Sequence, residues 1–356
     1  MKTASSAVRP AGPPSVFGLR REELAERLAA LGMPGYRATQ LFTWLYQRHQ
    51  RDPGAMTDLP QSLRRDLESH VRLALPPVAE LAESRDGATQ KFVLELADGA
   101  RVECVGMRTA HRMTMCVSSQ VGCALKCSFC ATGLMGLKRN LAPDEIVAQV
   151  MVMGEHQGWR DDRFNIVFMG MGEPLANYAA MMDAIHILHD PRGLNMGARR
   201  ITVSTSGIVP QIRNLAEEGL PLGLALSLHA TTDELRNELV PVNRRWPLAE
   251  LLPAARDYGE RTGRRVTLEY TLIAGVNDRD RDADELAEIA GRMPSKINLI
   301  PYNPVPGLGY ERPSPERVEA FARRLYPRAP AVMIRNTLGG EIWAACGQLG
   351  ARPPGA

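Results

Sequence analysis

Residues 113–130, MTMCVSSQVGCALKCSFC, place a predicted strand directly before a group of closely spaced cysteines. The strand is predicted over 113–120, and Cys123, Cys127 and Cys130 follow it at C-x3-C-x2-C spacing. In α/β proteins with parallel strands, functional sites lie at the carboxyl ends of the strands. If this strand belongs to a parallel sheet, the stretch indicates the edge of the sheet at which the site lies.

The pattern of a strand followed by a helix repeats from about residue 112 to 346. Helical segments separate the strands, such as 143–157, which opens at Pro143 with acidic residues beside it. Units of this kind build a parallel sheet with right-handed crossovers, either as a full or partial α/β barrel or as an open doubly wound sheet. Six strands are predicted, at 113–120, 164–171, 199–206, 221–230, 265–273 and 296–303.

Two smaller regions precede this repeat, and a tail is predicted at each end of the chain. Apolar residues at three- and four-residue spacing predict a small helical domain, and short strand-like segments with Asp-Gly turns predict a β linker. The start is rich in Ala, Pro and Ser, and we expect it to be disordered. The predicted regions are a tail at 1–19, a helical domain at 20–75, an antiparallel β linker at 76–111, an α/β barrel at 112–349 and a tail at 350–356.

The composition is that of a globular protein. Of the 356 residues, 44% are hydrophobic and 23% are charged, which leaves ample apolar surface to bury. No run of about 18 apolar residues predicts a membrane span, and the first residues lack the apolar core of a signal peptide. We therefore expect a cytoplasmic protein. The net charge of +3 is only weak support for nucleic-acid binding.

Cysteines are concentrated in one part of the chain. Five of the six lie between residues 104 and 130, and Cys346 stands alone near the C-terminus. In a cytosolic protein such clustering indicates a metal site or catalysis rather than static disulfides. An all-protein [4Fe–4S] site takes four cysteines, so the C-x3-C-x2-C group would leave one iron open to a small molecule. The alternatives are a zinc site completed by Cys116 or His111, and inert buried cysteines.

Glycine and polar residues follow several of the predicted strands. Glycines let a backbone approach a ligand, and a glutamate beside them can accept from an ammonium group. Each residue also has a simpler interpretation, because glycines make tight turns, serines cap helices and a lone histidine is often structural. The candidates for ligand contacts are Gly172, Glu173, Ser204, Ser227, Leu228, His229 and Asn303.

The C-x3-C-x2-C spacing, with Phe129 before the last cysteine, resembles the signature of the radical S-adenosylmethionine (SAM) superfamily. The resemblance implies a partial (β/α)6-type barrel and a [4Fe–4S] cluster held by Cys123, Cys127 and Cys130, with SAM on the open iron. It also implies reductive cleavage of SAM to a 5′-deoxyadenosyl radical, a reaction that the cofactor rather than the protein supplies. The strand-end candidates would then be SAM contacts.

Longer strings narrow the resemblance. Taken in order along about residues 20–349, they closely resemble the RlmN family of dual-specificity RNA methyltransferases. This resemblance implies methylation of C2 of an adenosine in the peptidyl-transferase centre of 23S rRNA, and of C2 of the adenosine 3′ of the anticodon in tRNA. The matching strings are CVSSQVGC (116–123), LKRN (137–140), MGMGEP (169–174), STSG (204–207), SLHA (227–230), KINLIP (296–301) and ACGQL (345–349).

The same resemblance implies roles for three further residues. Cys346 would take a methyl group from one SAM molecule and carry it as S-methylcysteine, and a second SAM would provide the radical, so two are consumed per methylation. Glu103 would be the acceptor of the C2 proton. Cys116 would release the RNA by forming a transient disulfide with Cys346. Cys104 matches no role in the family and is predicted to be structural.

The implied partners are 23S rRNA, tRNA and an external electron donor such as flavodoxin, and the enzyme is expected to be a monomer. The helical domain resembles an RNA-binding unit, and basic pairs could hold phosphates, although such pairs are also common at solvated helix and strand ends. Two other functions share these features: C8 methylation of the same rRNA base, and RNA binding by a metal-stabilised protein without catalysis. The basic pairs are Lys138-Arg139, Arg199-Arg200 and Arg244-Arg245.

Overall fold

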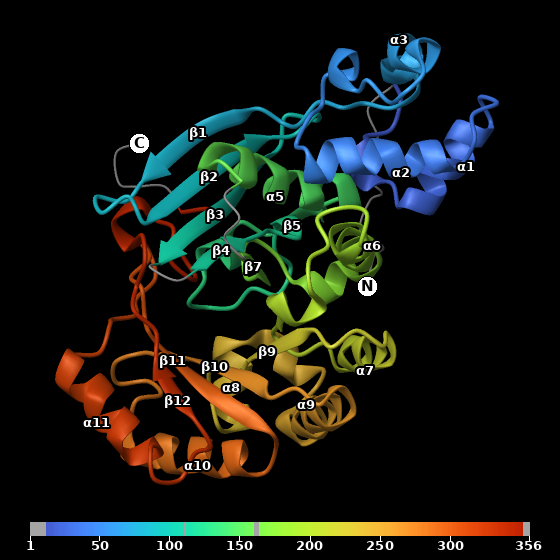
Figure 1. The fold of residues 1–356 in the computed structure, drawn as a ribbon. Helices are drawn as coiled ribbons and strands as arrows, with labels where there is room; N and C mark the ends of the chain where they lie inside the picture. The colour runs from blue at the N-terminus through green and yellow to red at the C-terminus, as the bar shows by residue number, and fades with distance from the viewer. Residues whose placement is uncertain (1–11, 110–111, 160–163, 352–356) are drawn as a thin grey trace.

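A single sheet of ten strands runs through the molecule, as the computed structural model shows for residues 12–109, 112–159 and 164–351. Parts of the two predicted tails and His111 lie outside these described residues. The described end of the N-terminal tail, which was expected to be disordered, instead forms a turn in which Val16 and Phe17 are buried. The strand order is β1-β2-β3-β4-β7-β8-β9-β10-β11-β12, so the sheet follows the order of the chain (Figure 1). Pairing is antiparallel from β1 to β4 and parallel from β4 to β12, which divides the sheet into two halves.

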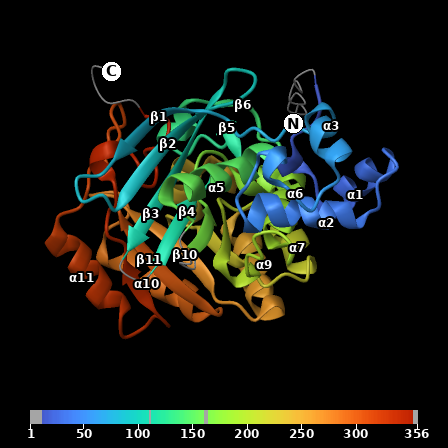
Figure 2. The same cartoon turned by 45° about the horizontal axis from the view of Figure 1, so that its top comes forward.

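The parallel half contains all six strands predicted from the repeat. It also contains β12, an edge strand that is too short to be recognised from an alternating pattern. The sheet is curved, and its two ends, β1 and β12, do not pair (Figures 1 and 2), which confirms the partial barrel. Its strands are β4 (Arg112–Cys116), β7 (Phe164–Phe168), β8 (Ile201–Thr205), β9 (Gly223–Ser227), β10 (Val266–Leu272), β11 (Ser295–Pro301) and β12 (Val332–Ile334).

The antiparallel half consists of β1 (Val78–Glu83), β2 (Thr89–Glu95) and β3 (Arg101–Thr109). Because β3 pairs with β4, these strands extend the barrel sheet instead of forming a separate linker. The register sets Val93 opposite Glu103 and Val105 opposite Cys116. The predicted proton acceptor and one of the predicted reactive cysteines therefore lie on adjacent strands.

Helices cover the convex side of the parallel strands, as expected for right-handed crossovers (Figure 1). The helix that begins at Pro143 packs against β3 and α6 as well as the N-terminal turn Val16–Gly18, which explains why residues 146–154 are all buried. The helices are α5 (Pro143–Gln157), α6 (Tyr178–His189), α7 (Val209–Glu217), α8 (Asp233–Leu239), α9 (Leu248–Thr262), α10 (Asp280–Gly291) and α11 (Pro315–Leu325).

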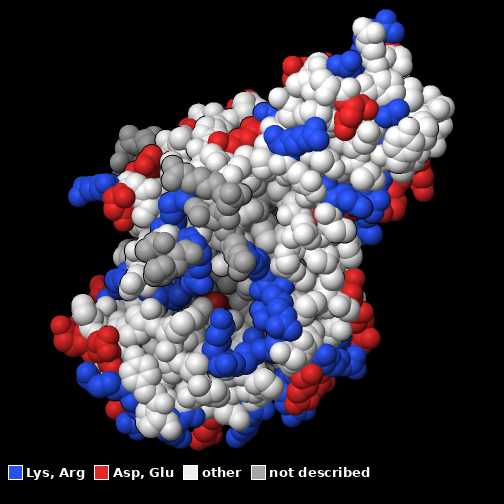
Figure 3. All heavy atoms as spheres, in the orientation of Figure 1, with Lys and Arg blue, Asp and Glu red and all other residues white. Residues whose placement is uncertain are grey.

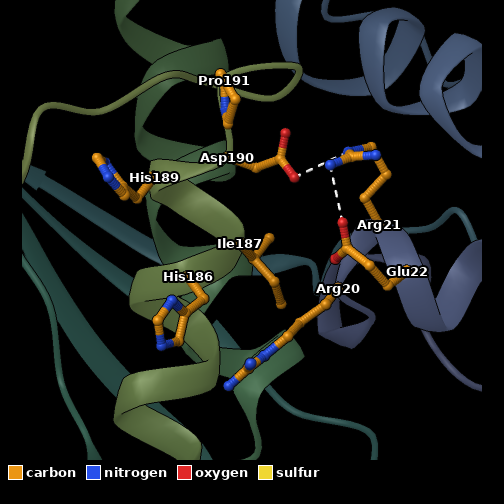
Figure 4. A pocket seen from close by; sticks show the side chains of 8 residues that line it. All are labelled: Arg20, Arg21, Glu22, His186, Ile187, His189, Asp190 and Pro191. Atoms are coloured by element: carbon orange, nitrogen blue, oxygen red, sulfur yellow. Dashed lines mark hydrogen bonds and ion pairs between the residues drawn. The ribbon is translucent and has the colours of Figure 1, made fainter. Parts of the chain in front are cut away.

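The predicted helical region contains α1 (Arg21–Ala29), α2 (Tyr36–Phe42) and α3 (Gln61–His70), which lie beside α5 and α6 (Figures 1 and 2). Ion pairs fasten it to the barrel: Arg21 Nε lies 3.0 Å from Asp190 Oδ2, and Arg51 pairs with Glu155. A cavity of about 220 Å³ at this junction is lined by residues 20–22, 186, 187 and 189–191, and none of the predicted site residues lines it (Figure 4). Among the described residues, no helix has the length and apolar character needed to cross a bilayer.

Candidate active site

The three closely spaced cysteines lie in a loop that a small hairpin closes. Its strands are β5 (Gln120–Gly122) and β6 (Leu137–Asn140), and the short α4 (Ala131–Leu134) follows the last cysteine. Gly122 has a φ of +80°, and a Cβ added there would fall 1.8 Å from the carbonyl oxygen of Gly136. Only glycine allows this approach, so the base of the loop is fixed by backbone contact.

The thiols of this loop share one partly buried space. Burial, followed by Glu173 and Cys130, raises the pKa of Cys123 to about 12, and burial together with the other two cysteines raises that of Cys127. Bound cations reverse such shifts by stabilising thiolates. Within the described residues, no three His, Cys, Asp or Glu side chains converge on the position of one metal ion. Three cysteine thiols in one loop are a donor set that suits an iron–sulfur cluster with one iron left open.

A buried carboxylate lies where β7 and β8 end. Glu173 is 3% exposed, and its oxygens accept from the backbone N–H groups of Ser206, at 2.8 Å, and Leu175, at 3.1 Å. Burial raises the pKa of Glu173, and these hydrogen bonds oppose the shift. The preceding Gly172 has a φ of +99°, and a Cβ there would meet Gln120 at 2.5 Å. The glycine is required by close backbone packing, and the acid is fixed in place beside the cysteine loop.

The predicted contacts on β8 and β9 lie together. The hydroxyl oxygens of Ser204 and Ser227 are 3.4 Å apart, and the N–H of Leu228 donates to the carbonyl of Glu269 on β10. His229 has a φ of +58°, which a non-glycine residue adopts rarely and often at functional sites. These strand ends form one continuous polar edge, as the rule for parallel sheets requires.

The His229 ring is held between the cysteine loop and the next strand. Its Nδ1 accepts from the N–H of Thr271 at 3.0 Å, and its ring centre lies 4.8 Å from that of Phe129. Burial, and then the charge of Arg236, lowers the pKa of His229 to about 3, so the ring is neutral. Since Nδ1 accepts, Nε2 carries the proton and is available as a donor.

Arg236 on α8 supports this edge from behind, and sequence analysis did not identify it. The side chain is fully buried. Its guanidinium donates to the carbonyl oxygens of Ser206, Ser227 and Leu228, at distances from 2.7 to 3.1 Å, and to Asn243 Oδ1 at 2.7 Å. It thereby joins the carboxyl ends of β8 and β9. No motif contains Arg236, so no sequence signal could have identified it.

Cys346 lies in a C-terminal segment, residues 343–350, that is fastened to the cysteine loop. The N–H of Ala131 donates to the carbonyl of Gly347 at 2.8 Å, and Thr132 Oγ1 donates to that of Leu349 at 2.6 Å. Asn303 Nδ2 donates to the carbonyl of Cys346 itself at 3.2 Å. Asn303 was predicted as a SAM contact, and the structure shows that its amide holds the C-terminal segment.

The two predicted reactive cysteines are near one another but differ in exposure. Cys346 is exposed and Cys116 is buried, and all six cysteines are free thiols, so the predicted transient disulfide is not formed here. Burial, and then the neighbouring Cys346, raises the pKa of Cys116 to about 12. Desolvation by the surrounding protein also raises the pKa of Cys346, and Arg335 opposes the shift at both thiols. Arg335 follows β12 directly and was not predicted.

Glu103 contacts the end of the C-terminal segment at Gly350. Its Oε2 accepts from the N–H of Gly350 at 3.1 Å and lies 3.9 Å from Lys91 Nζ, and its backbone carbonyl accepts from Ser118 Oγ at 2.6 Å. Sequence analysis took Glu103 as a candidate only through the family resemblance, because a strand glutamate normally faces solvent. The next residue, Cys104, is fully buried.

Comparison with known proteins agrees with this geometry. Residues 117–287 match the family model of the Radical SAM superfamily, and residues 15–73 match that of the ribosomal RNA large subunit methyltransferase N-terminal domain. The chain is 47% identical to the dual-specificity RNA methyltransferase RlmN of Dinoroseobacter shibae, over 95% of this chain and 89% of that protein. It is 48% identical to the protein of the same name from an Anaeromyxobacter species, over 96% and 92%. The crystal structure of a radical SAM methyltransferase from Sphaerobacter thermophilus has a TM-score of 0.90 and 49% identity, covering 94% of this chain and 99% of that one.

An open parallel barrel with a C-x3-C-x2-C loop at its carboxyl edge defines a radical SAM enzyme. Within this class of enzymes, the chain shares about half of its residues with two RlmN proteins over nearly its whole length. The chain belongs to the RlmN family of dual-specificity RNA methyltransferases.

Proposed function

We propose that this enzyme methylates C2 of an adenosine in the peptidyl-transferase centre of 23S rRNA, and C2 of the adenosine 3′ of the anticodon in tRNA. The observation that carries the proposal is the position of Cys346. Its segment is hydrogen-bonded to Ala131 after the cysteine loop and, through the N–H of Gly350, to Glu103. The Cys346 thiol also raises the pKa of Cys116. Glu103 and Cys116, on neighbouring strands, are thus brought close to a segment that lies more than 200 positions further along the chain.

The chemistry explains why such an assembly is needed. Adenine C2 belongs to an electron-poor ring and is not nucleophilic, so it cannot attack a sulfonium methyl group directly. When bound, a [4Fe–4S] cluster and SAM would supply methyl groups and a carbon radical able to take hydrogen from an unreactive C–H bond. The residues that would hold them are Cys123, Cys127 and Cys130 for the cluster, and Gly172, Glu173, Ser204, Ser227, Leu228, His229 and Asn303 for SAM.

The covalent steps fall to Cys346 and its neighbours. The Cys346 thiolate takes a methyl group from bound SAM, and after loss of one hydrogen atom the carbon of that group bonds to C2, which joins protein and RNA. Glu103 takes the C2 proton. The Cys116 thiolate then attacks the Cys346 sulfur, so an S–S bond forms as the S–C bond breaks, and the released carbon gains a proton to become methyl. Cleavage of the S–C bond leaves one electron in excess, which balances the one electron used to make the radical and would return to the oxidised cluster. Two electrons from the donor later reduce the disulfide for another turnover.

The charge of Arg335 and the exposure of Cys346 favour the proposed roles of the two reactive cysteines. A thiolate rather than a thiol is the nucleophile in both sulfur steps. Arg335 lowers the pKa of Cys346 and of Cys116 against the effect of burial. The exposed Cys346 is open to an RNA base, whereas Cys116 is buried and lies close enough to Cys346 for the Cys346 thiol to raise its pKa.

RNA binding has support from surface charge. A target base in folded RNA must leave its stack to reach Cys346, and phosphates beside it need cations. Lys and Arg side chains gather along the hollow in the middle of the face shown in Figure 3. Of the predicted basic pairs, Arg139 is committed to Asp98 and Glu145, whereas Lys138, Arg199 and Arg244 are exposed. We expect a monomeric enzyme served by an external electron donor such as flavodoxin.

Product identification tests this proposal. Anaerobically reconstituted enzyme is incubated with SAM, a reductant and unmodified rRNA fragment, and the digested RNA is compared with methyladenosine standards by mass spectrometry. We expect 2-methyladenosine, and none from Cys346→Ala. 8-Methyladenosine would instead assign the C8 reaction with the same cysteine roles. No product from an enzyme that cleaves SAM would overturn the RNA substrate.

A further inference from the structure

A buried lysine lies beside the proposed proton acceptor. Lys91 on β2 is 8% exposed, so its ammonium group has little access to water. Burying an ammonium group is unfavourable unless hydrogen bonds and opposite charges replace the lost water. The partners of Lys91 therefore indicate what the residue is for.

Both partners belong to the proposed reaction machinery. Lys91 Nζ donates to the carbonyl of Trp343 at 3.4 Å and lies 3.9 Å from Glu103 Oε2. The same Glu103 oxygen accepts from the N–H of Gly350 at 3.1 Å. Lys91 and Glu103 thus hold the two ends of the C-terminal segment, and Cys346 lies between the ends.

The backbone of the segment needs this support. Trp343 has a φ of +56°, a left-handed conformation that a large side chain disfavours. Such a conformation persists only where surrounding contacts determine it. The Trp343 carbonyl reaches Lys91 from this strained residue, so the ammonium group stabilises the turn that leads to Cys346.

We propose that Lys91 is a positioning residue that sets the Glu103 carboxylate and the Cys346 segment in register with one another. The proposal rests on the proposed role of Glu103 as proton acceptor. A single cation then serves two purposes: it fixes the carbonyl at the start of the segment, and it keeps the adjacent carboxylate charged and aimed at the segment. Lys91 needs no contact with RNA or SAM for either purpose.

The charges around Glu103 give the sign of the effect. Burial raises the pKa of Glu103, Lys91 on β2 and the Gly350 N–H lower it, and Glu80 on β1 raises it. Glu80 is paired with Arg101 at 2.9 Å, and the adjacent Cys104 is a buried thiol. Lys91 is thus the cation that acts directly on Glu103, so its removal will raise the pKa of Glu103 and leave less carboxylate at neutral pH.

The first test is independent of activity. Hydrogen exchange is measured on the full-length, reconstituted wild type, Lys91→Met and Lys91→Arg, with Arg101→Met as a control that removes an exposed cation from the same sheet. We expect amides of residues 344–350 to exchange roughly tenfold faster in Lys91→Met, with little change in Lys91→Arg or Arg101→Met. Unchanged exchange in Lys91→Met would refute the positioning of the segment.

The second test is the pH dependence of RNA methylation. Since the base must be ionised, turnover rises with pH, and we expect Lys91→Met to move this rise upward by about one pH unit and to lower turnover roughly tenfold at pH 7. Lys91→Arg should restore most of the rate, and Lys91→Met should add little in a Glu103→Gln background. An unshifted profile in Lys91→Met would overturn the effect on Glu103.

Absence of product from the wild type would count against the proposed function alone, and the hydrogen-exchange result would still decide whether Lys91 positions the segment. If Lys91→Met does not fold, Lys91→Gln replaces it in both tests, with the same expected and contradicting results.

Discussion

The two halves of the site are built in different ways. In the parallel half, Glu173, Ser204, Ser227 and His229 each follow a strand, and the sheet brings successive strand ends together. In the other half, Lys91, Glu103, Cys116 and Cys346 come from β2, β3, β4 and a segment 230 positions beyond Cys116, where no repeating unit relates them. The positions of the residues in the first half follow from the fold class. The positions of those in the second half depend on particular contacts between segments that are far apart in the sequence.

This difference separates two parts of the chemistry. The strand-end half is common to the superfamily that the cysteine loop defines, and it would hold the cluster and SAM. The half formed by β2, β3, the end of β4 at Cys116 and the C-terminal segment would hold the methyl group and the RNA base. Substitutions in the second half should therefore leave cluster and SAM binding intact, and this binding can be measured separately from RNA methylation.

The largest effect is expected for Cys346→Ala. Without the sulfur that carries the methyl group, we expect RNA methylation to fall by at least about a thousandfold, while iron content and SAM binding remain at wild-type values. Cys127→Ala is the matched change in the parallel half and should lose iron and methylation together. Loss of iron in Cys346→Ala would contradict the separation of the two halves.

Cys116→Ala should stop the reaction one step later. The covalent bond between Cys346 and RNA should still form, but no thiolate would be placed to break it. We expect a protein–RNA adduct that survives denaturing electrophoresis, at most about one adduct per enzyme, and little released methylated RNA. Cys104→Ala, which removes a buried thiol from the adjacent strand, should release RNA normally. Full turnover of Cys116→Ala without bound RNA would refute its role in release.

A smaller effect on stability is expected for Arg236→Met in the parallel half. This substitution leaves the carbonyls of Ser206, Ser227 and Leu228 buried without their donor. We expect the free energy of unfolding to fall by about 3 kcal/mol, and SAM affinity to fall with it. Arg256→Met, on the exposed face of α9, should change stability by less than about 0.5 kcal/mol. Equal stabilities of the two variants would show that Arg236 does not hold the strand ends.

The same contrast explains how much could be predicted from the sequence. Six strands and the cysteine loop follow from local patterns, because each strand–helix unit is recognisable by itself. The partial barrel was implied only by the family resemblance, since the repeat alone also allowed a full barrel or an open doubly wound sheet. Three-residue β12 has too little pattern to recognise, and the joining of β3 to β4 in one sheet depends on pairing between segments that were predicted separately.

Site residues show the same limit. The residues after each strand could be chosen because parallel strands end at one edge. Glu103, Cys116 and Cys346 could be chosen only through the resemblance to a family. Lys91, Arg236 and Arg335 were missed, because what matters for them is a buried contact with a carbonyl, a carboxylate or a thiol, and no spacing in the sequence encodes such contacts.

One measurement tests most directly whether the methyl group passes through Cys346. Enzyme is first methylated with SAM that carries a trideuterated methyl group, freed of unbound SAM, and then given unlabelled SAM, reductant and RNA for a single turnover. We predict methyladenosine with two deuterium atoms in its methyl group and loss of the label from Cys346. An unlabelled product, with the label still on Cys346, would contradict the transfer.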